Sequence, residues 1–223
     1  MAEVVLVHGA WHGAWCWDKV VAELDRREVA NTAVELPLSG FEDDVAAARA
    51  VIEAAGPGAV VCGHSYGGLV ISAAAYGATE VARLVYLAAL MSEQGEDLGD
   101  LLGADSSGLM DALVFDEKGY MTVEPTRIHE IFYADSSAEE AGRCAALLRP
   151  MPAGAISAHA APPAWLSIPS TYVVCANDQA IPPPSQRRMA LRATSTVEWP
   201  CDHSPFLTRP GAIATLLQEA LAQ

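Results

Sequence analysis

The chain has 223 residues, which suits one domain with an insertion and is long enough to bury a single large core. Acidic residues outnumber basic ones by 28 to 13, and the formal net charge of −15 disfavours phosphate backbones and anionic lipids as partners. We therefore expect neither a nucleic-acid nor a membrane partner, and no apolar run is long enough to span a bilayer. The five cysteines are scattered without paired spacing, which argues against disulfides and zinc. Free thiols and the lack of a basic leader region favour a cytoplasmic location.

The predicted elements alternate between strand and helix. Apolar runs are typical of strands buried on both faces, and the segments between them have helical spacing. This alternation predicts an α/β fold with a doubly wound, mostly parallel sheet. In chain order we expect a strand at 3–8, a helix at 15–27, a strand at 31–36, a helix at 41–55, a strand at 59–62, a helix at 69–75, a strand at 82–90, a strand at 170–176, a helix at 184–193, a strand at 195–199 and a helix at 210–221.

The alternation breaks between residues 92 and 165. This segment is acidic and glycine-rich at its start and rich in alanine and proline at its end. Helical patterns lie between these parts, at 126–133 and 138–148. We interpret residues 92–165 as a small cap inserted over the carboxyl ends of the strands. Residues 1–91 and 166–223 then form the α/β core of a single domain.

A G-x-S-x-G pattern, Gly-His-Ser-Tyr-Gly at 63–67, stands between an expected strand and an expected helix. This strand–turn–helix setting is that of a nucleophile elbow. The turn is so tight that its central residue takes a positive φ, and glycines at both ends remove Cβ atoms that would clash. An incidental serine in a glycine-rich turn is the alternative, but the flanking elements favour Ser65 as a nucleophile.

A serine hydroxyl needs a base to accept its proton. Of the histidines that follow Ser65, His203 lies in a loop just after the last expected strand, at the same edge of the sheet as the elbow. His129 and His159 fall in the expected cap, where a surface or lining role is the simpler interpretation. We therefore predict that His203 is the base.

The base in turn needs an acid that orients it. Asp178 follows the buried strand at 170–176, and a carboxylate at that strand end can reach a histidine on the neighbouring loop. Asp202 adjoins His203 in sequence, and its side chain is expected to point away from the same imidazole nitrogen. Glu93 remains a second candidate. We predict Asp178 as the acid.

The oxyanion of an acyl-transfer reaction needs two backbone N–H donors. Tyr66, directly after the nucleophile, is expected to supply one, and Ala10, in the turn after the first strand, is the best candidate for the other. Candidates for the substrate pocket share an apolar or aromatic side chain near these positions: Trp11, Met91, Phe132, Tyr133, Trp165 and Phe206.

Two other histidine arrangements invite a functional interpretation. His8 and His12 are four residues apart, but with neither a helix nor an acidic third ligand there we expect no metal site. His64, beside the nucleophile, is expected to be a packed neighbour and not a second base.

Four segments carry a resemblance to a known family: residues 6–17, 63–68, 172–178 and 202–206. They resemble the α/β-hydrolase superfamily, and most closely its branch of plant methyl esterases, such as methyl salicylate esterase, and hydroxynitrile lyases. The resemblance implies the α/β-hydrolase fold, within which we expect the triad of Ser65, His203 and Asp178 to work without a cofactor. It is specific at both ends of the core and weak across 92–165, the part that would select the substrate.

Departures from the family pattern favour ester hydrolysis. In the Ser/Thr-type lyases of this branch, a threonine stands at the position of Gly9 and a lysine follows the catalytic histidine. Ser204 follows the histidine here and lacks the charge that would stabilise departing cyanide. Serine in place of aspartate at position 65 disfavours haloalkane dehalogenase and epoxide hydrolase chemistry.

We therefore expect a serine carboxylesterase that cleaves a small, fairly apolar ester through an acyl-enzyme. A hydroxynitrile lyase, a C–C or lactone hydrolase, a biosynthetic tailoring enzyme and a ligand-binding protein on the same scaffold stay open as alternatives, as does a homodimer.

Overall fold

Six parallel strands form the central sheet of the computed structural model, which describes residues 2–103, 107–156 and 162–222. Their order across the sheet is β2-β1-β3-β4-β8-β9, and each neighbouring pair is parallel. The strands are β1 (Val4–Val7), β2 (Asn31–Val34), β3 (Ala59–His64), β4 (Val81–Leu87), β8 (Ser170–Cys175) and β9 (Ser195–Trp199).

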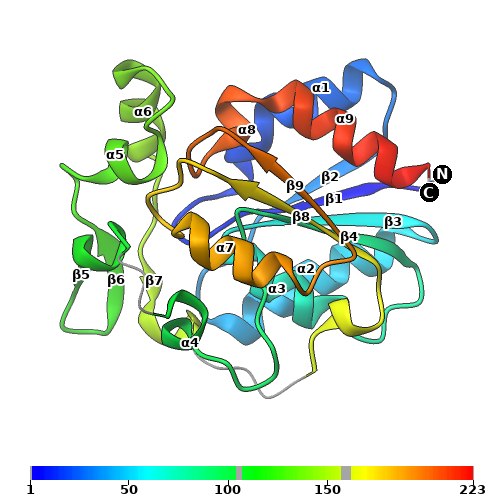
Figure 1. Ribbon diagram of the computed structural model, residues 1–223, viewed down its shortest axis with the longest axis horizontal. Helices are drawn as coiled ribbons and strands as arrows, with labels where there is room; N and C mark the ends of the chain where they lie inside the picture. The colour runs from blue at the N-terminus through cyan, green and yellow to red at the C-terminus, as the bar shows by residue number, and fades with distance from the viewer. Residues whose placement is uncertain (1, 104–106, 157–161, 223) are drawn as a thin grey trace.

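Helices cover both faces of this sheet (Figure 1). They are α1 (Asp18–Arg26), α2 (Phe41–Ala55), α3 (Gly67–Ala74), α7 (Pro183–Ala190), α8 (Pro205–Thr208) and α9 (Pro210–Leu221). The first and last of them, α1 and α9, pack together on one face, while α2, α3 and α7 lie on the other. The expected doubly wound α/β architecture is confirmed.

Burial explains why the apolar runs form the inner strands. Every residue of β1, β3 and β8 is buried, because helices cover these strands from both layers. Each fully buried Val or Leu side chain stabilises the fold by about 1.5–3 kcal/mol. The edge strands β2 and β9 are partly exposed and accordingly carry more polar residues.

Between β4 and β8 the chain leaves the sheet and builds a second layer beside the carboxyl ends of the strands (Figure 1). This layer holds an antiparallel sheet of order β5-β6-β7, which the sequence did not indicate. The helices expected at 126–133 and 138–148 are present in shorter form. The elements are α4 (Leu98–Leu102), β5 (Leu113–Phe115), β6 (Tyr120–Val123), α5 (Ile128–Phe132), α6 (Ala138–Ala145) and β7 (Met151–Pro152).

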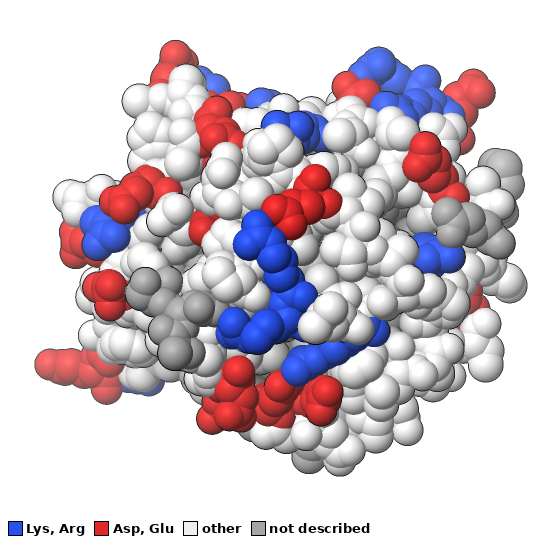
Figure 2. Space-filling model, in the orientation of Figure 1, with Lys and Arg blue, Asp and Glu red and all other residues white. Residues whose placement is uncertain are grey.

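The surface carries charges of both signs. On the face shown in Figure 2, Lys and Arg side chains form short groups that border Asp and Glu side chains. Arg187 pairs with Glu198 at 2.7 Å, and Arg192 pairs with Glu96 at 2.6 Å. In the described part of the chain, no helix combines the length and apolarity needed to cross a bilayer.

Candidate active site

Ser65 lies in a tight turn between β3 and α3. Its φ of 54° falls in the left-handed region, which is unfavourable for a residue with a side chain and persists only where the surroundings enforce it. A Cβ at Gly63 would lie 2.6 Å from the carbonyl oxygen of Gly67, and one at Gly67 would lie 2.7 Å from that of His8. Strand and helix therefore approach so closely that both positions require glycine.

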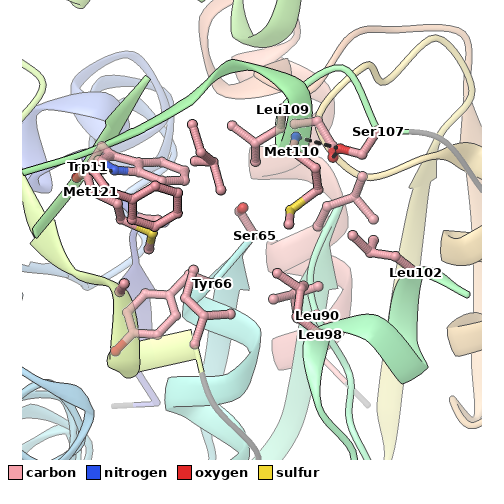
Figure 3. A pocket seen from close by; sticks show the side chains of 17 residues that line it. Trp11, Ser65, Tyr66, Leu90, Leu98, Leu102, Ser107, Leu109, Met110 and Met121 are labelled. Carbon is pink, nitrogen blue, oxygen red and sulfur yellow. Dashed lines mark hydrogen bonds between the residues drawn. The ribbon is translucent and has the colours of Figure 1, made fainter. Parts of the chain in front are cut away.

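The serine side chain faces a cavity of about 190 Å³ (Figure 3). Trp11 and Met121 lie on one side of Ser65, and Leu102 and Ser107 lie on the other. No charged side chain belongs to the described lining, which is almost wholly apolar.

The two other hydroxyl groups in this lining are already engaged. Ser107 Oγ donates to the carbonyl oxygen of Ala180 at 2.6 Å. Tyr66 Oη donates to Oδ2 of the buried Asp44 at 2.7 Å, so the tyrosine offers its ring and not its hydroxyl to the cavity.

His203 and Asp178 form a buried hydrogen-bonded pair. The imidazole Nδ1 donates to Asp178 Oδ2 at 2.7 Å. The two side chains meet because they follow β8 and β9, which are neighbours in the sheet and end at the same edge. An Nδ1–H that bonds to a carboxylate leaves Nε2 as the basic atom of the ring.

Asp178 is held by donors on both carboxylate oxygens. Oδ1 accepts the backbone N–H groups of Ala180, at 2.7 Å, and Ile181, at 3.0 Å. Oδ2 also accepts Nε2 of Gln186, at 2.7 Å. Gln186 is buried on α7, and its Oε1 accepts the N–H of Cys175 at 2.9 Å. The sequence reasoning missed Gln186, because nothing local marks a helical glutamine as buried.

Ala10 and Tyr66 line the cavity together with Ser65. Among the described residues, neither of their backbone N–H groups has a hydrogen-bond acceptor. Buried N–H groups without partners are rare, so a pair of them beside Ser65 fits an acceptor that arrives with a bound molecule.

The six side chains expected in the pocket divide into two groups. Trp11 lines the cavity, and its indole Nε1 donates to the carbonyl oxygen of Met121 at 3.0 Å. The other five are not part of the described lining: Met91, Phe132, Tyr133, Trp165 and Phe206. One of these five packs beside the expected base, since the ring centroids of Phe132 and His203 lie 5.7 Å apart. About half of the lining comes instead from mostly aliphatic residues between 98 and 121, which share no recognisable sequence pattern.

The alternative acids and bases are engaged elsewhere. His129 bonds through Nε2 to the carbonyl oxygen of Ser136 at 3.1 Å, and His159 lies outside the described residues. The Glu93 carboxylate lies 3.8 Å from Arg192 and is exposed. Burial raises the pKa of Asp202, whose carboxylate accepts backbone N–H groups.

Three further histidines surround the site as neutral, buried rings. Burial lowers the pKa of His8 to about 4 and that of His12 to about 3, and it holds the pKa of His64 well below its ordinary value of 6.5. His64 Nε2 donates to the carbonyl oxygen of His203 at 2.8 Å, as suits a packed neighbour. The described residues include no group of three His, Cys, Asp or Glu side chains placed to hold a metal ion.

Comparison with known proteins decides the family. The model of the alpha/beta hydrolase family matches residues 4–216. The chain belongs to the α/β-hydrolase family. The resemblance noted in the sequence is thereby confirmed.

Relatives of this α/β-hydrolase include proteins named as hydrolases and esterases. Alpha/beta hydrolase nvfD of Aspergillus novofumigatus is 29% identical over an alignment of 243 positions, which covers 99% of this chain and 96% of that protein. Putative methylesterase 13 of Arabidopsis thaliana is 26% identical over an alignment of 244 positions, which covers 96% of this chain and 55% of that protein. A carbendazim hydrolyzing esterase of Nocardioides is 38% identical over 115 residues, covering 46% of this chain and 48% of that protein.

Solved structures share the fold of this α/β-hydrolase over nearly its full length. A pyrethroid hydrolase from Sphingobium faniae superimposes with a TM-score of 0.86 at 21% identity, covering 99% of this chain and 97% of that one. The methylesterase MES16 from Arabidopsis gives a TM-score of 0.80 at 24% identity, covering 100% of this chain and 99% of that one.

Proposed function

We propose that this α/β-hydrolase is a serine carboxylesterase with Ser65 as nucleophile, His203 as base and Asp178 as the orienting acid. The observation that carries the proposal is the 2.7 Å bond from His203 Nδ1 to Asp178 Oδ2, which makes Nε2 a proton acceptor at the sheet edge that presents Ser65. The names of the relatives, among them esterases and methylesterases, support ester cleavage.

In this mechanism His203 Nε2 takes the proton of Ser65 Oγ as the oxygen attacks the ester carbonyl. The N–H groups of Ala10 and Tyr66 hold the oxyanion of the tetrahedral intermediate. Collapse of the intermediate expels the alcohol, which takes its proton from the imidazolium, and leaves the acyl group on the serine. Water activated by the same imidazole then releases the acid and restores the free hydroxyl.

The cavity walls set the substrate class. With no charged side chain in the described lining, and with the Tyr66 and Ser107 hydroxyls engaged, a charged group on the substrate would lose its hydration without gaining a partner. An uncharged ester with compact apolar groups loses nothing in this way and gains apolar contact. The proposed substrate is therefore small and apolar beyond the ester itself.

The space around Gly9 favours hydrolysis over the lyase alternative. A Cβ at this position would lie 2.8 Å from Ser65 Cβ and 3.0 Å from His64 Nδ1. The threonine that the resemblance associates with lyases therefore does not fit here without a shift of the nucleophile. Ser204, buried directly after the base, supplies no positive charge.

The proposal extends to organisation and location. Residues 1–91 and 166–223 form the catalytic core, and residues 92–165 form a cap that supplies much of the cavity wall. All five cysteines are buried and free, which supports a reducing compartment such as the cytoplasm.

The test compares wild type, Ser65→Ala and, as a matched control, Ser39→Ala, which alters an exposed serine. Ser65→Ala should reduce turnover of p-nitrophenyl acetate by several orders of magnitude, by analogy with triad deletions. Ser39→Ala should retain wild-type turnover. Cyanide release from mandelonitrile, assayed beside ester hydrolysis, separates an esterase from a lyase. Retained turnover in Ser65→Ala, or cyanide release that exceeds ester cleavage, would refute the proposal.

A further inference from the structure

The loop after β1, residues 8–14, contains Ala10, and we call it the oxyanion loop. Its carbonyl oxygens are bound one after another: His8 Nδ1 bonds to that of Gly9 at 2.8 Å, and His12 Nδ1 bonds to that of Ala10 at 2.8 Å. In a trans peptide the N–H points opposite to the C=O. Holding the Gly9 carbonyl therefore fixes the direction of the Ala10 N–H, the proposed oxyanion donor.

The imidazoles of His8 and His12 are both neutral, and in each ring the proton lies on Nδ1, which donates to the carbonyl oxygen. The backbone N–H of Leu36 donates to His8 Nε2 at 3.0 Å, and the hydroxyl of Tyr133 bonds to His12 Nε2 at 2.9 Å. An Nε2 that accepts a hydrogen bond leaves Nδ1 as the protonated atom, which is what a bond to a carbonyl oxygen requires. Each ring therefore links the oxyanion loop to another segment, His8 to that of Leu36 and His12 to that of Tyr133.

One guanidinium group joins the segment of Leu36 to the oxyanion loop itself. Arg149 Nη2 donates to the carbonyl oxygen of His12 at 3.1 Å and to that of Leu36 at 3.0 Å. The same group pairs with Glu35 at 2.5 Å, and Glu35 in turn accepts the N–H of Ala14, at the far end of the loop, at 2.7 Å.

The main chain at the arginine adds a contact of its own. Its backbone N–H donates at 2.8 Å to the carbonyl oxygen of Trp11, a non-glycine residue with a φ of 63°. Strain of that kind persists only when the surroundings enforce it. Arg149 follows α6, far along the chain from the loop that it binds.

We propose that Arg149 is a positioning residue for the oxyanion hole. It fixes Leu36 and His12 relative to each other, and through the His8 imidazole, which bonds to both Leu36 and the Gly9 carbonyl, it directs the Ala10 N–H toward Ser65. The His12 imidazole holds the next carbonyl of the same loop, that of Ala10. This role rests on the proposed esterase function. It also gives the cap a part in the chemical step, because the cap supplies the group that aligns the donor.

The chemistry of the side chain explains why an arginine stands here. Both carbonyl oxygens and the carboxylate meet at one nitrogen, Nη2, which the planar guanidinium carries at the far end of the side chain. A lysine ammonium is more strongly hydrated and sits on a flexible four-carbon stem, so we expect it not to stay at that point. Arg149→Lys should therefore preserve the charge of the cap and still impair the reaction.

The test measures kcat and KM of Arg149→Ala with p-nitrophenyl butyrate. The main-chain bond to Trp11 remains in this variant, so only the side-chain contacts are lost. We expect kcat to fall at least tenfold, but by less than the roughly 10²–10³-fold that deletion of an oxyanion donor costs, with KM within about twofold of wild type. Millimolar guanidinium should restore part of the lost kcat.

The matched control is Arg143→Ala, which removes an exposed arginine of α6 that pairs with Glu139 at 2.6 Å. Its kcat should match wild type, and guanidinium should have no effect on it. Thermal unfolding of each variant identifies a loss of folded protein. If Arg149→Ala does not fold, Arg149→Lys replaces it in every comparison.

A second measurement separates this proposal from the esterase function. The rate at which a fluorophosphonate labels Ser65 depends on the same oxyanion donors but requires no ester turnover. If wild type is labelled but cleaves no ester, the proposed function fails, and slower labelling of Arg149→Ala still supports the positioning role. Unchanged kcat and unchanged labelling in the folded variant overturn the role of Arg149 alone. Failure of wild type both to cleave esters and to be labelled overturns both proposals.

Discussion

A single methyl group at residue 9 tests how tightly the nucleophile and the oxyanion loop are packed. In Gly9→Ala the new Cβ would lie 2.8 Å from Ser65 Cβ and 3.0 Å from His64 Nδ1. Carbon atoms in contact prefer about 3.5–4.0 Å, so at least one of these groups must move by more than about half an ångström. Ser65 is constrained by its turn, and His64 is tied to the carbonyl oxygen of His203 at 2.8 Å.

Both stability and rate should respond to this displacement. Overpacking of a rigid core costs about 1–3 kcal/mol, which for a chain of this size lowers the melting temperature by roughly 2–12 °C. A displacement approaching 1 Å between nucleophile and oxyanion donor lowers the rate by up to about 10²-fold. We therefore expect Gly9→Ala to unfold at a lower urea concentration and to lose most of its kcat for p-nitrophenyl acetate.

Gly142→Ala is the matched control. Gly142 lies inside α6, and a Cβ there would meet no atom within 4 Å. An alanine in a helix interior should stabilise the protein by about 0.5–1 kcal/mol and leave the rate unchanged. If Gly9→Ala matched Gly142→Ala in both stability and kcat, the packing reasoning would be wrong, and Gly9 would no longer distinguish an esterase from a lyase.

Two further predictions concern the groups around the site. Unfolding free energy should fall as pH drops from about 6.5 toward 4, because His8, His12 and His64 stay neutral in the fold, with pKa values lowered to about 4, to about 3 and well below 6.5, while the unfolded chain takes up all three protons. Urea titrations at pH 7 and pH 5 should show a loss of up to about 4 kcal/mol per pH unit, and equal stability at both would contradict the neutral assignment. Gln186→Leu removes a hydrogen-bond donor to Asp178 and the acceptor of the buried Cys175 N–H, so it should destabilise the protein by about 2–4 kcal/mol and lower kcat. Wild-type kinetics in this variant would show that Gln186 does not support Asp178 in the reaction.

The core of the fold was predictable because burial on both faces leaves a strong mark on the sequence. The helix expected at 41–55 and the strand expected at 195–199 have those bounds in the structure. The strand expected at 82–90 ends at Leu87, because Ala88 takes a φ of 44° and turns the chain out of the sheet. Such a backbone reversal depends on the segments that pack around the strand end, and the apolar run alone does not reveal it.

The catalytic candidates were also accessible from sequence, since strand ends at one edge bring distant loops together. Asp178 and His203 meet as expected because β8 and β9 are neighbours. The segment between β4 and β8 was harder to predict. Its strands are two to four residues long, and Met121 pairs with Met151 across a long stretch of chain. The sequence therefore contains no alternation of apolar and polar residues long enough to predict the small sheet.

The pocket candidates show the same limit. Tyr133 and Phe206 have the aromatic character and the sequence position expected of pocket residues. They are buried in packing, and much of the described cavity lining is supplied instead by residues between β4 and β8, such as Leu102 and Met121. Which apolar side chain faces a cavity depends on how this segment packs against the central sheet, and that is a tertiary property.

Rapid-quench mass spectrometry of the enzyme mixed with p-nitrophenyl butyrate tests the proposed chemistry most directly. A butyryl adduct should form on the peptide that contains Ser65 and decay at the rate of turnover, and Ser65→Ala should form none. Turnover of the ester without any adduct, or an adduct on another residue, would contradict the acyl-enzyme mechanism.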